Sequence, residues 1–424
     1  MRNKNDYKYN CGISLKIYPS NKQKDIISFN DGISRFIYNR LVAVNNERYF
    51  LRKSSDKVPV YQERLDYLDS SYKTTTSIRN AIPFLNSPLV DGCAIANARA
   101  NYGQAWENFK KNPAAGIPTF HKKGYSKQYQ TNAVYQGVET IFSGSARFID
   151  KEHLQIPKLG IIRFSGSKKR INKLFQNGKN IRIGTVTVRM DATGDYYISL
   201  QLASNKPFVE ISRKTGKALG IDVNLRNYLT DSNGNVVDNP KYYKKSQKKL
   251  AKAQRIQSRR LENAKKNTDP RDKKRFEKAK NYQKQRIKTA EIYKRVKNQR
   301  KDFLHKISEK IVKSQDIIIV EDLKPSNLKK NHKLAKAISD ASWSMFLNML
   351  EYKAKWYGKI FLKVPPQYTT QTCSCCGHVM SGKEKLSLAV EDWICPKCGA
   401  IHIRDLNAAI NILKKGMILL KKVA

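Results

Sequence analysis

Two closely spaced pairs of cysteines near the C-terminal end constrain the fold of this chain more than any other feature. Cys373 and Cys376 form one C-x-x-C pair, and Cys395 and Cys398 form a second pair after 18 intervening residues. This spacing is typical of a four-cysteine zinc ribbon, in which each turn presents two thiolates to one tetrahedral ion. We therefore predict one structural Zn²⁺ bound by these four residues.

The remaining cysteines do not extend this pattern. Cys375 and His378 lie beside the first pair. We predict that both are bystanders, with an exchange of ligands as the alternative. Cys11 and Cys93 are far from the cluster and no spacing pairs them, so a disulfide framework is not expected. Five of the seven cysteines crowd into one cluster, as metal ligands in a reducing compartment would.

The charge of the chain predicts a polyanionic partner. Its 424 residues include 82 Lys and Arg against 35 Asp and Glu, a formal net charge of +47. A folded monomer with this charge repels itself strongly, and nucleic acid is the obvious counterpart. A membrane partner is a weaker interpretation, because no apolar run spans a bilayer and neither a signal core nor a lipidation motif is present.

The strongest local excess of charge lies over residues 241–310, with 27 Lys and Arg against 7 Asp and Glu. The break at 267–270 predicts a helical hairpin, and its charge is too one-sided for salt bridges along the helices. Contact with a nucleic-acid backbone is therefore favoured over a merely solvated face. A second candidate is the segment 115–130, where lysines are mixed with aromatic residues, and a solvated loop is an equal alternative there. The predicted contact residues are Lys122, Lys123, Lys244, Lys245, Lys248, Arg255, Arg259, Lys297 and Arg300.

The N-terminal half predicts a sheet interrupted by helices. A strand over 7–18 is followed by helical periodicity through 22–49 and 91–111. From about residue 131 to 203 the period becomes alternating, with a hairpin over 181–202 and further strands over 154–164. These strands predict a small β-barrel interrupted by a helical insert over 20–124.

Three carboxylates stand where predicted elements end or begin. Asp222 and Glu321 close predicted strands, and Asp405 opens the last predicted helix. Strands that end in acids, with helices crossing between them, describe an RNase H-like α/β domain. Carboxylates suit Mg²⁺, and two such ions about 3.5–4 Å apart support phosphodiester hydrolysis. Each acid alone has an ordinary explanation, such as a helix cap for Asp405. Since Glu321 and Asp322 are neighbours on a strand, only one of them faces the site.

Several segments then carry a resemblance to a known family. Together they resemble the RuvC-type nuclease and zinc ribbon of TnpB proteins, transposon-encoded RNA-guided DNA endonucleases similar to compact type V CRISPR effectors. The segments are GIDVNLRNYLTDSNG (220–234), IIIVEDL (317–323), SWSMFLNMLEYKAKWYG (342–358, in a helix predicted from 340), QYTTQTCSCCG (367–377), CPKCG (395–399) and RDLNAAINI (404–412). LKIYPSNKQ, FIYNRL and LQIPKLGIIRF in the N-terminal half resemble the same family.

The resemblance implies a multidomain α+β fold and a function. It makes Asp222, Glu321 and Asp405 the catalytic acids that bind two Mg²⁺, and it adds guide RNA and target double-stranded DNA as partners. A guide–target heteroduplex would supply sequence specificity, after recognition of a short adjacent DNA motif. The implied parts are a wedge β-barrel (1–19 and 125–210), a helical recognition domain (20–124), a RuvC-like nuclease domain (211–366 and 401–424) and a zinc ribbon that binds target nucleic acid (367–400).

The implied location is the cytoplasm of a prokaryote, at the nucleoid when DNA is bound. The resemblance does not decide between a monomer and a homodimer, and it gives neither the origin of the guide nor the adjacent DNA motif.

Two positions depart from the family pattern. Asn224 stands where many members have Gly, and since Asn tolerates left-handed backbone we expect the turn to be preserved. Ile403 replaces an Asp that we do not assign to metal. The alternative functions are a guide-bound repressor that does not cut and a DNA strand-transfer protein.

Overall fold

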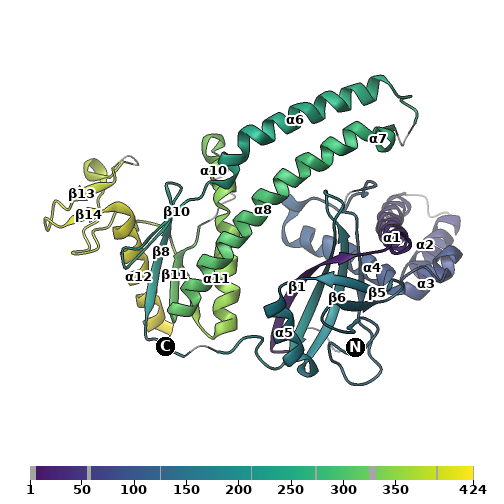
Figure 1. Cartoon of the computed structure of the whole chain (residues 1–424), viewed down its shortest axis with the longest axis horizontal. Helices are drawn as coiled ribbons and strands as arrows, with labels where there is room; N and C mark the ends of the chain where they lie inside the picture. The colour runs from purple at the N-terminus through teal and green to yellow at the C-terminus, as the bar shows by residue number, and fades with distance from the viewer. Residues whose placement is uncertain are drawn as a thin grey trace. The chain divides into compact units, whose positions relative to one another are not determined.

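The computed structural model describes residues 6–54, 59–124, 126–211, 213–272, 275–323, 331–387 and 390–423. The chain divides into two compact units, Met1–Phe208 and Val209–Ala424 (Figure 1). The boundaries predicted for the smaller domains stay predictions. In the described part of the chain, no helix combines the length and the hydropathy that crossing a membrane requires.

The N-terminal unit is built on one antiparallel sheet of seven strands in the order β2-β6-β7-β1-β5-β4-β3. The strands are β1 (Tyr9–Tyr18), β2 (Gln128–Asn132), β3 (Arg147–Phe148), β4 (His153–Ile156), β5 (Gly160–Ser165), β6 (Ile181–Met190) and β7 (Tyr196–Ser204). The first strand lies between β5 and β7, so the helices that follow it in sequence are an insertion, as predicted. The pairing is a row with β2 and β3 at its ends, and closure into a barrel stays a prediction.

The inserted helices have their own core. They are α1 (Asn21–Lys53), α2 (Pro59–Ser71), α3 (Thr75–Ala81) and α4 (Gly92–Lys111), and α5 (Lys168–Gln176) follows within the sheet region. Ser20 caps α1 in a reciprocal capping box with Gln23. Buried residues at helical spacing, among them Ile33, Ile37 and Ile95, pack α1 against α4.

The C-terminal unit holds a five-stranded sheet in the order β10-β9-β8-β11-β12. The strands are β8 (Ala218–Val223), β9 (Asn227–Asp231), β10 (Val236–Asp238), β11 (Ile317–Glu321) and β12 (Ile360–Val364). β8, β11 and β12 run parallel, and β9 and β10 are antiparallel additions at one edge. Parallel strands need long crossovers, and the helices supply them.

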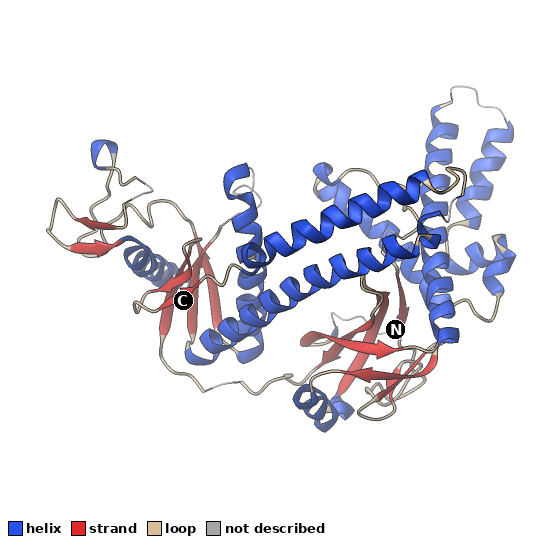
Figure 2. Cartoon of the chain, turned by 45° about the horizontal axis from the view of Figure 1, so that its top comes forward, coloured by secondary structure: helices blue, strands red, loops and turns tan. Residues whose placement is uncertain are grey.

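The helices of this unit are α6 (Tyr242–Lys266), α7 (Arg275–Lys278), α8 (Lys280–Ser314), α10 (His332–Ala341), α11 (Trp343–Tyr357) and α12 (Arg404–Val423). α8, α10 and α11 pack on one face of the sheet and α12 packs on the other, whereas α6 and α7 extend away from it (Figures 1 and 2). Ile318 and Val320 of β11 share a core with α8 and α11, whereas Ile317 and Ile319 pack with residues of α12. Alternate residues of a strand point to opposite faces. The side chains of β11 therefore alternate between the core shared with α8 and α11 and the core shared with α12.

The predicted hairpin over 241–310 is confirmed, because α6 and α8 pack along each other after a break near residue 270. The predicted helix over 340–358 needs a correction. Ser342 adopts a left-handed backbone with φ of 55°, which ends α10 and lets α11 start in a new direction. The cysteine-rich segment contains a small antiparallel pair, β13 (Asp392–Ile394) with β14 (Ile401–Ile403).

Candidate active site and four-cysteine cluster

Two of the predicted catalytic acids lie side by side at the carboxyl ends of parallel strands. The register pairs Val320 of β11 with Ile221 of β8, so Glu321 and Asp222 occupy the next position on adjacent strands. Adjacent strands are about 4.8 Å apart. By the alternation described above, both side chains lie on the face that α12 covers. Asp322 points the other way and is exposed, as expected for the neighbour of a site residue.

The third acid reaches the same place through the packing of α12. Asp405 lies in the first turn of this helix. The backbone of α12 approaches β8 so closely that a Cβ added at Gly220 would lie 2.2 Å from the carbonyl oxygen of Ala409. No side chain fits at this distance, and glycine at 220 therefore permits the helix to lie on the strand two residues before Asp222.

The three carboxyl groups interact electrostatically. Burial raises the pKa of Asp222 well above its usual value, and the nearby charges of Glu321 and Asp405 raise it further. Burial also raises the pKa of Glu321 and of Asp405. Opposing effects come from the Thr369 hydroxyl at Glu321 and from Arg404 at Asp405. One buried and two half-buried acids, with Asp222 repelled by the other two, form a site whose charge a divalent cation would neutralise.

The cysteines and the acids offer different donor sets. Among the described residues, the ligand atoms of Cys373, Cys376, Cys395 and Cys398 all lie within 4.8 Å of one another and could hold a metal ion. The hard carboxylate oxygens of the three acids suit Mg²⁺.

The structure brings the four predicted zinc ligands together. The Sγ atoms of Cys373 and Cys398 are 3.7 Å apart, as are those of Cys376 and Cys395. A tetrahedral ion with Zn–S bonds of about 2.3 Å requires sulfur separations of about 3.8 Å, so the cluster fits zinc. Burial acts to raise the pKa of the Cys395 thiol, but backbone N–H groups of Cys398 and Lys397 and the adjacent thiols lower it to about 6.

One residue beside this cluster was missed in the sequence. His402 on β14 is buried, and its Nε2 lies 3.0 Å from the Sγ of Cys373. Its ring packs on Trp393, with centroids 4.4 Å apart. The two neighbours considered from the sequence lie elsewhere, since Cys375 is exposed and His378 contacts Glu384 at 2.8 Å. The sequence carries no sign of this, because an alternation of Ile401, His402 and Ile403 favours buried isoleucines and an exposed histidine, whereas the structure has the reverse.

Asn224 does not adopt the left-handed backbone expected of it, because it is absent from the positive-φ residues of the chain. Its side chain has a different role. The Nδ2 atom donates to Oδ2 of Asp405 at 2.9 Å, and the Oδ1 atom accepts from the N–H of Asn227 at 2.8 Å. Asn224 therefore contacts a predicted catalytic acid, which sequence patterns did not indicate.

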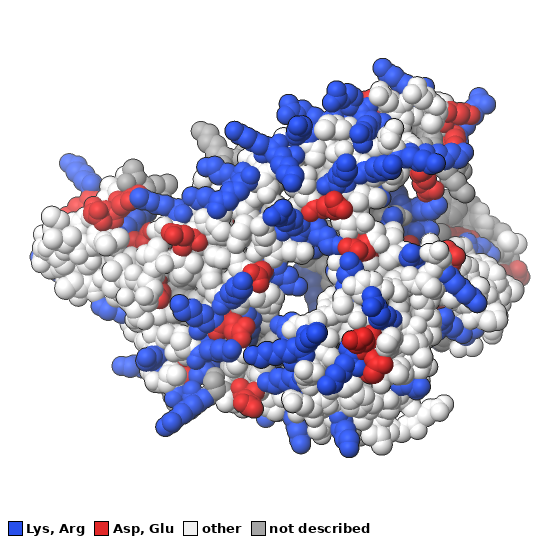
Figure 3. Space-filling model, in the orientation of Figure 1, with Lys and Arg blue, Asp and Glu red and all other residues white. Residues whose placement is uncertain are grey.

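The predicted nucleic-acid contacts are exposed, with one exception. Figure 3 shows Lys and Arg crowded over the α6–α8 hairpin. Lys244, Lys248, Arg255 and Arg259 recur on α6 at spacings that keep them near one face. Arg300 is the exception, because its guanidinium lies 2.8 Å from Asp340 and its side chain is only 21% exposed. This partly buried ion pair ties α8 to α10, and contact of Arg300 with nucleic acid stays a prediction.

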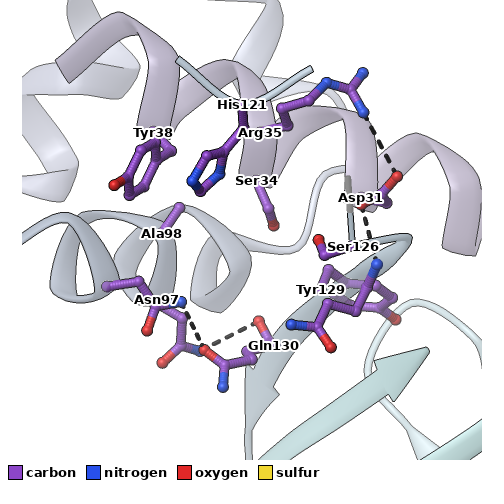
Figure 4. Close-up of a pocket in the computed structure, with 12 residues that line it drawn as sticks. Asp31, Ser34, Arg35, Tyr38, Asn97, Ala98, His121, Ser126, Tyr129 and Gln130 are labelled. Atoms are coloured by element: carbon purple, nitrogen blue, oxygen red, sulfur yellow. Dashed lines mark hydrogen bonds and ion pairs between the residues drawn. The ribbon is translucent and has the colours of Figure 1, made fainter. Parts of the chain in front are cut away.

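A polar cavity of about 140 Å³ lies in the N-terminal unit (Figure 4). The stacked rings of Tyr38 and His121 line it, with centroids 4.0 Å apart. On another side, Nδ2 of Asn101 donates to Oε1 of Gln130 at 2.9 Å. The buried hydroxyl of Tyr129 has no hydrogen-bond partner in the described part of the chain. The cavity thus combines amide groups and aromatic rings.

Three family models match the chain. One described as "Probable transposase" matches residues 201–332, and one described as "Cas12f1-like, TNB domain" matches residues 343–412. These two segments contain all three predicted catalytic acids and all four clustered cysteines. A model described as "Helix-turn-helix domain" matches residues 10–54, where the structure has β1 followed by the single long helix α1.

Individual relatives match over most or part of the chain. A protein of Streptomyces pristinaespiralis named "Putative RNA-guided DNA endonuclease" is 29% identical over 407 residues, covering 95% of this chain and 88% of the relative. "TnpB-like protein MJ0012" of Methanocaldococcus jannaschii is 33% identical over 132 residues, covering 30% of this chain and 58% of that protein. The structure titled "Cryo-EM structure of the Cas12f1-sgRNA-target DNA complex" aligns with a TM-score of 0.55 at 14% identity, over 95% of this chain and 98% of that one. This last similarity shows a shared fold alone.

Proposed function

We propose that this chain, which is TnpB-like by its motifs and by the matches above, is an RNA-guided DNA endonuclease. The observation that carries the proposal is the meeting of Asp222, Glu321 and Asp405 at one end of a mixed sheet, at the carboxyl ends of its parallel strands, in a strongly basic chain. Carboxylates gathered at strand ends suit hydrolysis of phosphodiester bonds, and the surplus of positive charge suits nucleic-acid partners.

The nuclease domain in this proposal is RNase H-like and of the RuvC type. Three antiparallel strands, β10, β9 and β8, continue into parallel β11 and β12, and the acids come from β8, β11 and α12. The three carboxylates would hold two Mg²⁺, which supply an activated water and charge for the leaving oxygen when bound. Burial of Asp222 among the other acids keeps its oxygens directed into the site. The four cysteines would hold one structural Zn²⁺.

Guide RNA and target DNA are the proposed partners. The exposed residues of the α6–α8 hairpin would contact the backbone of the RNA or of the heteroduplex, which is read by shape and charge rather than by sequence. The cavity beside Asn101 and Gln130 offers amide groups, and such groups recognise base edges. We propose that it takes part in reading the short motif next to the target. A cytoplasmic location follows from these partners, and the wedge and recognition domains stay predictions.

The first experiment is to sequence the RNA that copurifies with the chain expressed from its own locus. One dominant RNA, with a fixed scaffold and a variable end, is expected. The purified complex should then cut a plasmid that matches the variable end, in the presence of Mg²⁺, and spare an unmatched plasmid. Unrelated cellular RNA together with no matched cutting would contradict the proposal. Binding without cutting would favour a repressor, and joined strands would favour a transposase.

A further inference from the structure

Two neutral side chains outside the predicted set donate hydrogen bonds to two of the three acids. The amide of Asn224 donates to Asp405 at 2.9 Å. The hydroxyl of Thr369 donates to Oε1 of Glu321. Each carboxylate has two oxygens, so a single donor occupies one of them and leaves the other available for a cation.

The orientation of Asn224 is fixed by its own surroundings. Its Oδ1 accepts from the backbone N–H of Asn227 at 2.8 Å, so the amino group has to be the part that faces Asp405. An aspartate at this position would place a carboxylate against a carboxylate. Because the amide is uncharged, it donates to Asp405 without adding a further positive charge to that of the nearby Arg404.

Thr369 is fixed just as firmly. The residue is 2% exposed, and its carbonyl accepts from Nδ2 of Asn411 at 2.9 Å. Its hydroxyl has a second acceptor, the carbonyl of Pro366 at 3.1 Å. A hydroxyl has one proton to donate, and a carboxylate is the stronger of these two acceptors.

The helix that provides Asp405 also holds the turn that contains Thr369. Besides its bond to Thr369, Asn411 donates to the carbonyl of Thr372 at 2.6 Å. Asn407 donates to the same carbonyl at 2.8 Å and accepts from the N–H of Ser374 at 2.8 Å. The same helix therefore carries Asp405 and holds the turn with the donor to Glu321, so the two acids share one scaffold.

We propose that Asn224 and Thr369 are positioning residues of the acid site, each holding one carboxylate in the orientation that accepts a divalent cation. This inference rests on the proposed function, which makes the acids the metal ligands. Removal of a group that orients a metal ligand typically lowers metal affinity about 10- to 100-fold. The proposal therefore predicts weaker metal binding in a chain whose fold and zinc content are unchanged.

The test measures binding of Mn²⁺ by electron paramagnetic resonance to the full chain with its zinc retained. Thr369→Val keeps the shape of the side chain and removes the donor, and Asn224→Ala removes the amide. We expect each of these two substitutions to raise the dissociation constant for Mn²⁺ about tenfold or more. Thr369→Ser keeps the hydroxyl donor, so its dissociation constant should stay near that of the parent chain. Thr372→Val and Asn239→Ala are matched controls, because their side chains bond to backbone groups. Thr372 donates to the carbonyl of Tyr368, and Asn239 donates to the carbonyl of Leu225 and accepts from the N–H of Lys241.

Equal Mn²⁺ affinity in Thr369→Val, Thr372→Val and the parent chain would overturn the inference. If Thr369→Val does not fold, Asn224→Ala decides, since Asn224 lies in a half-buried loop. The half-saturating Mg²⁺ concentration for guided cleavage should rise in parallel in both variants. Failure of the proposed function looks different, because the parent chain would then cut no matched DNA while the differences in Mn²⁺ binding persist.

Discussion

Single residues decide whether the acid site is catalytic, and Asp222 is the most informative of them. It is 8% exposed and interacts with both other acids. Asp222→Ala should lower the guided cleavage rate by about 10³-fold or more and leave binding of the guide RNA unchanged, because the substitution removes a proposed metal ligand and no basic residue. A cleavage assay and a filter-binding assay on one preparation measure the two effects. Equal loss of both would contradict the role.

The raised pKa values of the acids predict how metal binding changes with pH. When folding raises the pKa of a carboxyl, that carboxyl stabilises the folded state at pH values below its ordinary pKa, which is 3.8 for Asp222 and 4.5 for Glu321. This stabilisation is lost as the pH rises through the raised pKa of the folded state. A divalent cation binds the deprotonated acids and cancels this loss. We therefore expect Mg²⁺ to raise the melting temperature more at about pH 8 than at about pH 5. Asp222→Asn should reduce this difference, and a pH-independent effect of Mg²⁺ would contradict the prediction.

The acids and the cysteines were predictable from the sequence, and their surroundings were not. Asp222, Glu321 and the cysteine pairs stand in short patterns whose neighbours already predict strands and knuckles. Thr369 contacts Glu321 from 48 residues away, and Arg300 pairs with Asp340 from 40 residues away. Such contacts depend on how α12 and α10 pack, and no local pattern encodes them.

At the scale of elements, the four-cysteine segment should behave as one metal-dependent unit. Its core is small, with Met380 and Trp393 packed around two of the cysteines, so the metal supplies much of its stability. Cys395→Ser should release most of the bound zinc, measured as zinc per chain by mass spectrometry. Cys375→Ser is the matched control, because Cys375 is exposed and outside the cluster. Zinc retained in Cys395→Ser, or lost equally in both variants, would contradict the assignment.

Elements with a clear period were predicted well, and their exact limits were not. The alternation over 181–202 and the hairpin break near 270 correspond to β6, β7 and the α6–α8 pair. The turn at Ser342 was missed because a serine with positive φ has no sequence signature. The close approach at Gly220 was missed for a similar reason, since one glycine in a strand does not say which helix lies against it.

At the scale of the whole molecule, the question is whether nucleic acid binds to the total charge or to a particular surface. A net charge of +47 attracts any polyanion, and that attraction is long-range and screened by salt. The α6–α8 hairpin could add a local contribution to binding, because exposed Lys and Arg recur along one face of its helix α6. The two contributions can be separated by making the same change of charge in two places.

The hairpin variant combines Lys248→Glu, Arg255→Glu and Arg259→Glu, and the control combines Lys168→Glu, Lys169→Glu and Lys173→Glu on α5, where all three residues are exposed. Both lose the same net charge. Each lost phosphate contact lowers the salt slope by about 0.7–0.9, so the hairpin variant should lose about two to three units of slope for its copurified RNA, and the control should change little. Affinity for heparin, which senses total charge, should fall equally in both. Equal slopes for RNA would mean that net charge, rather than the hairpin, holds the guide.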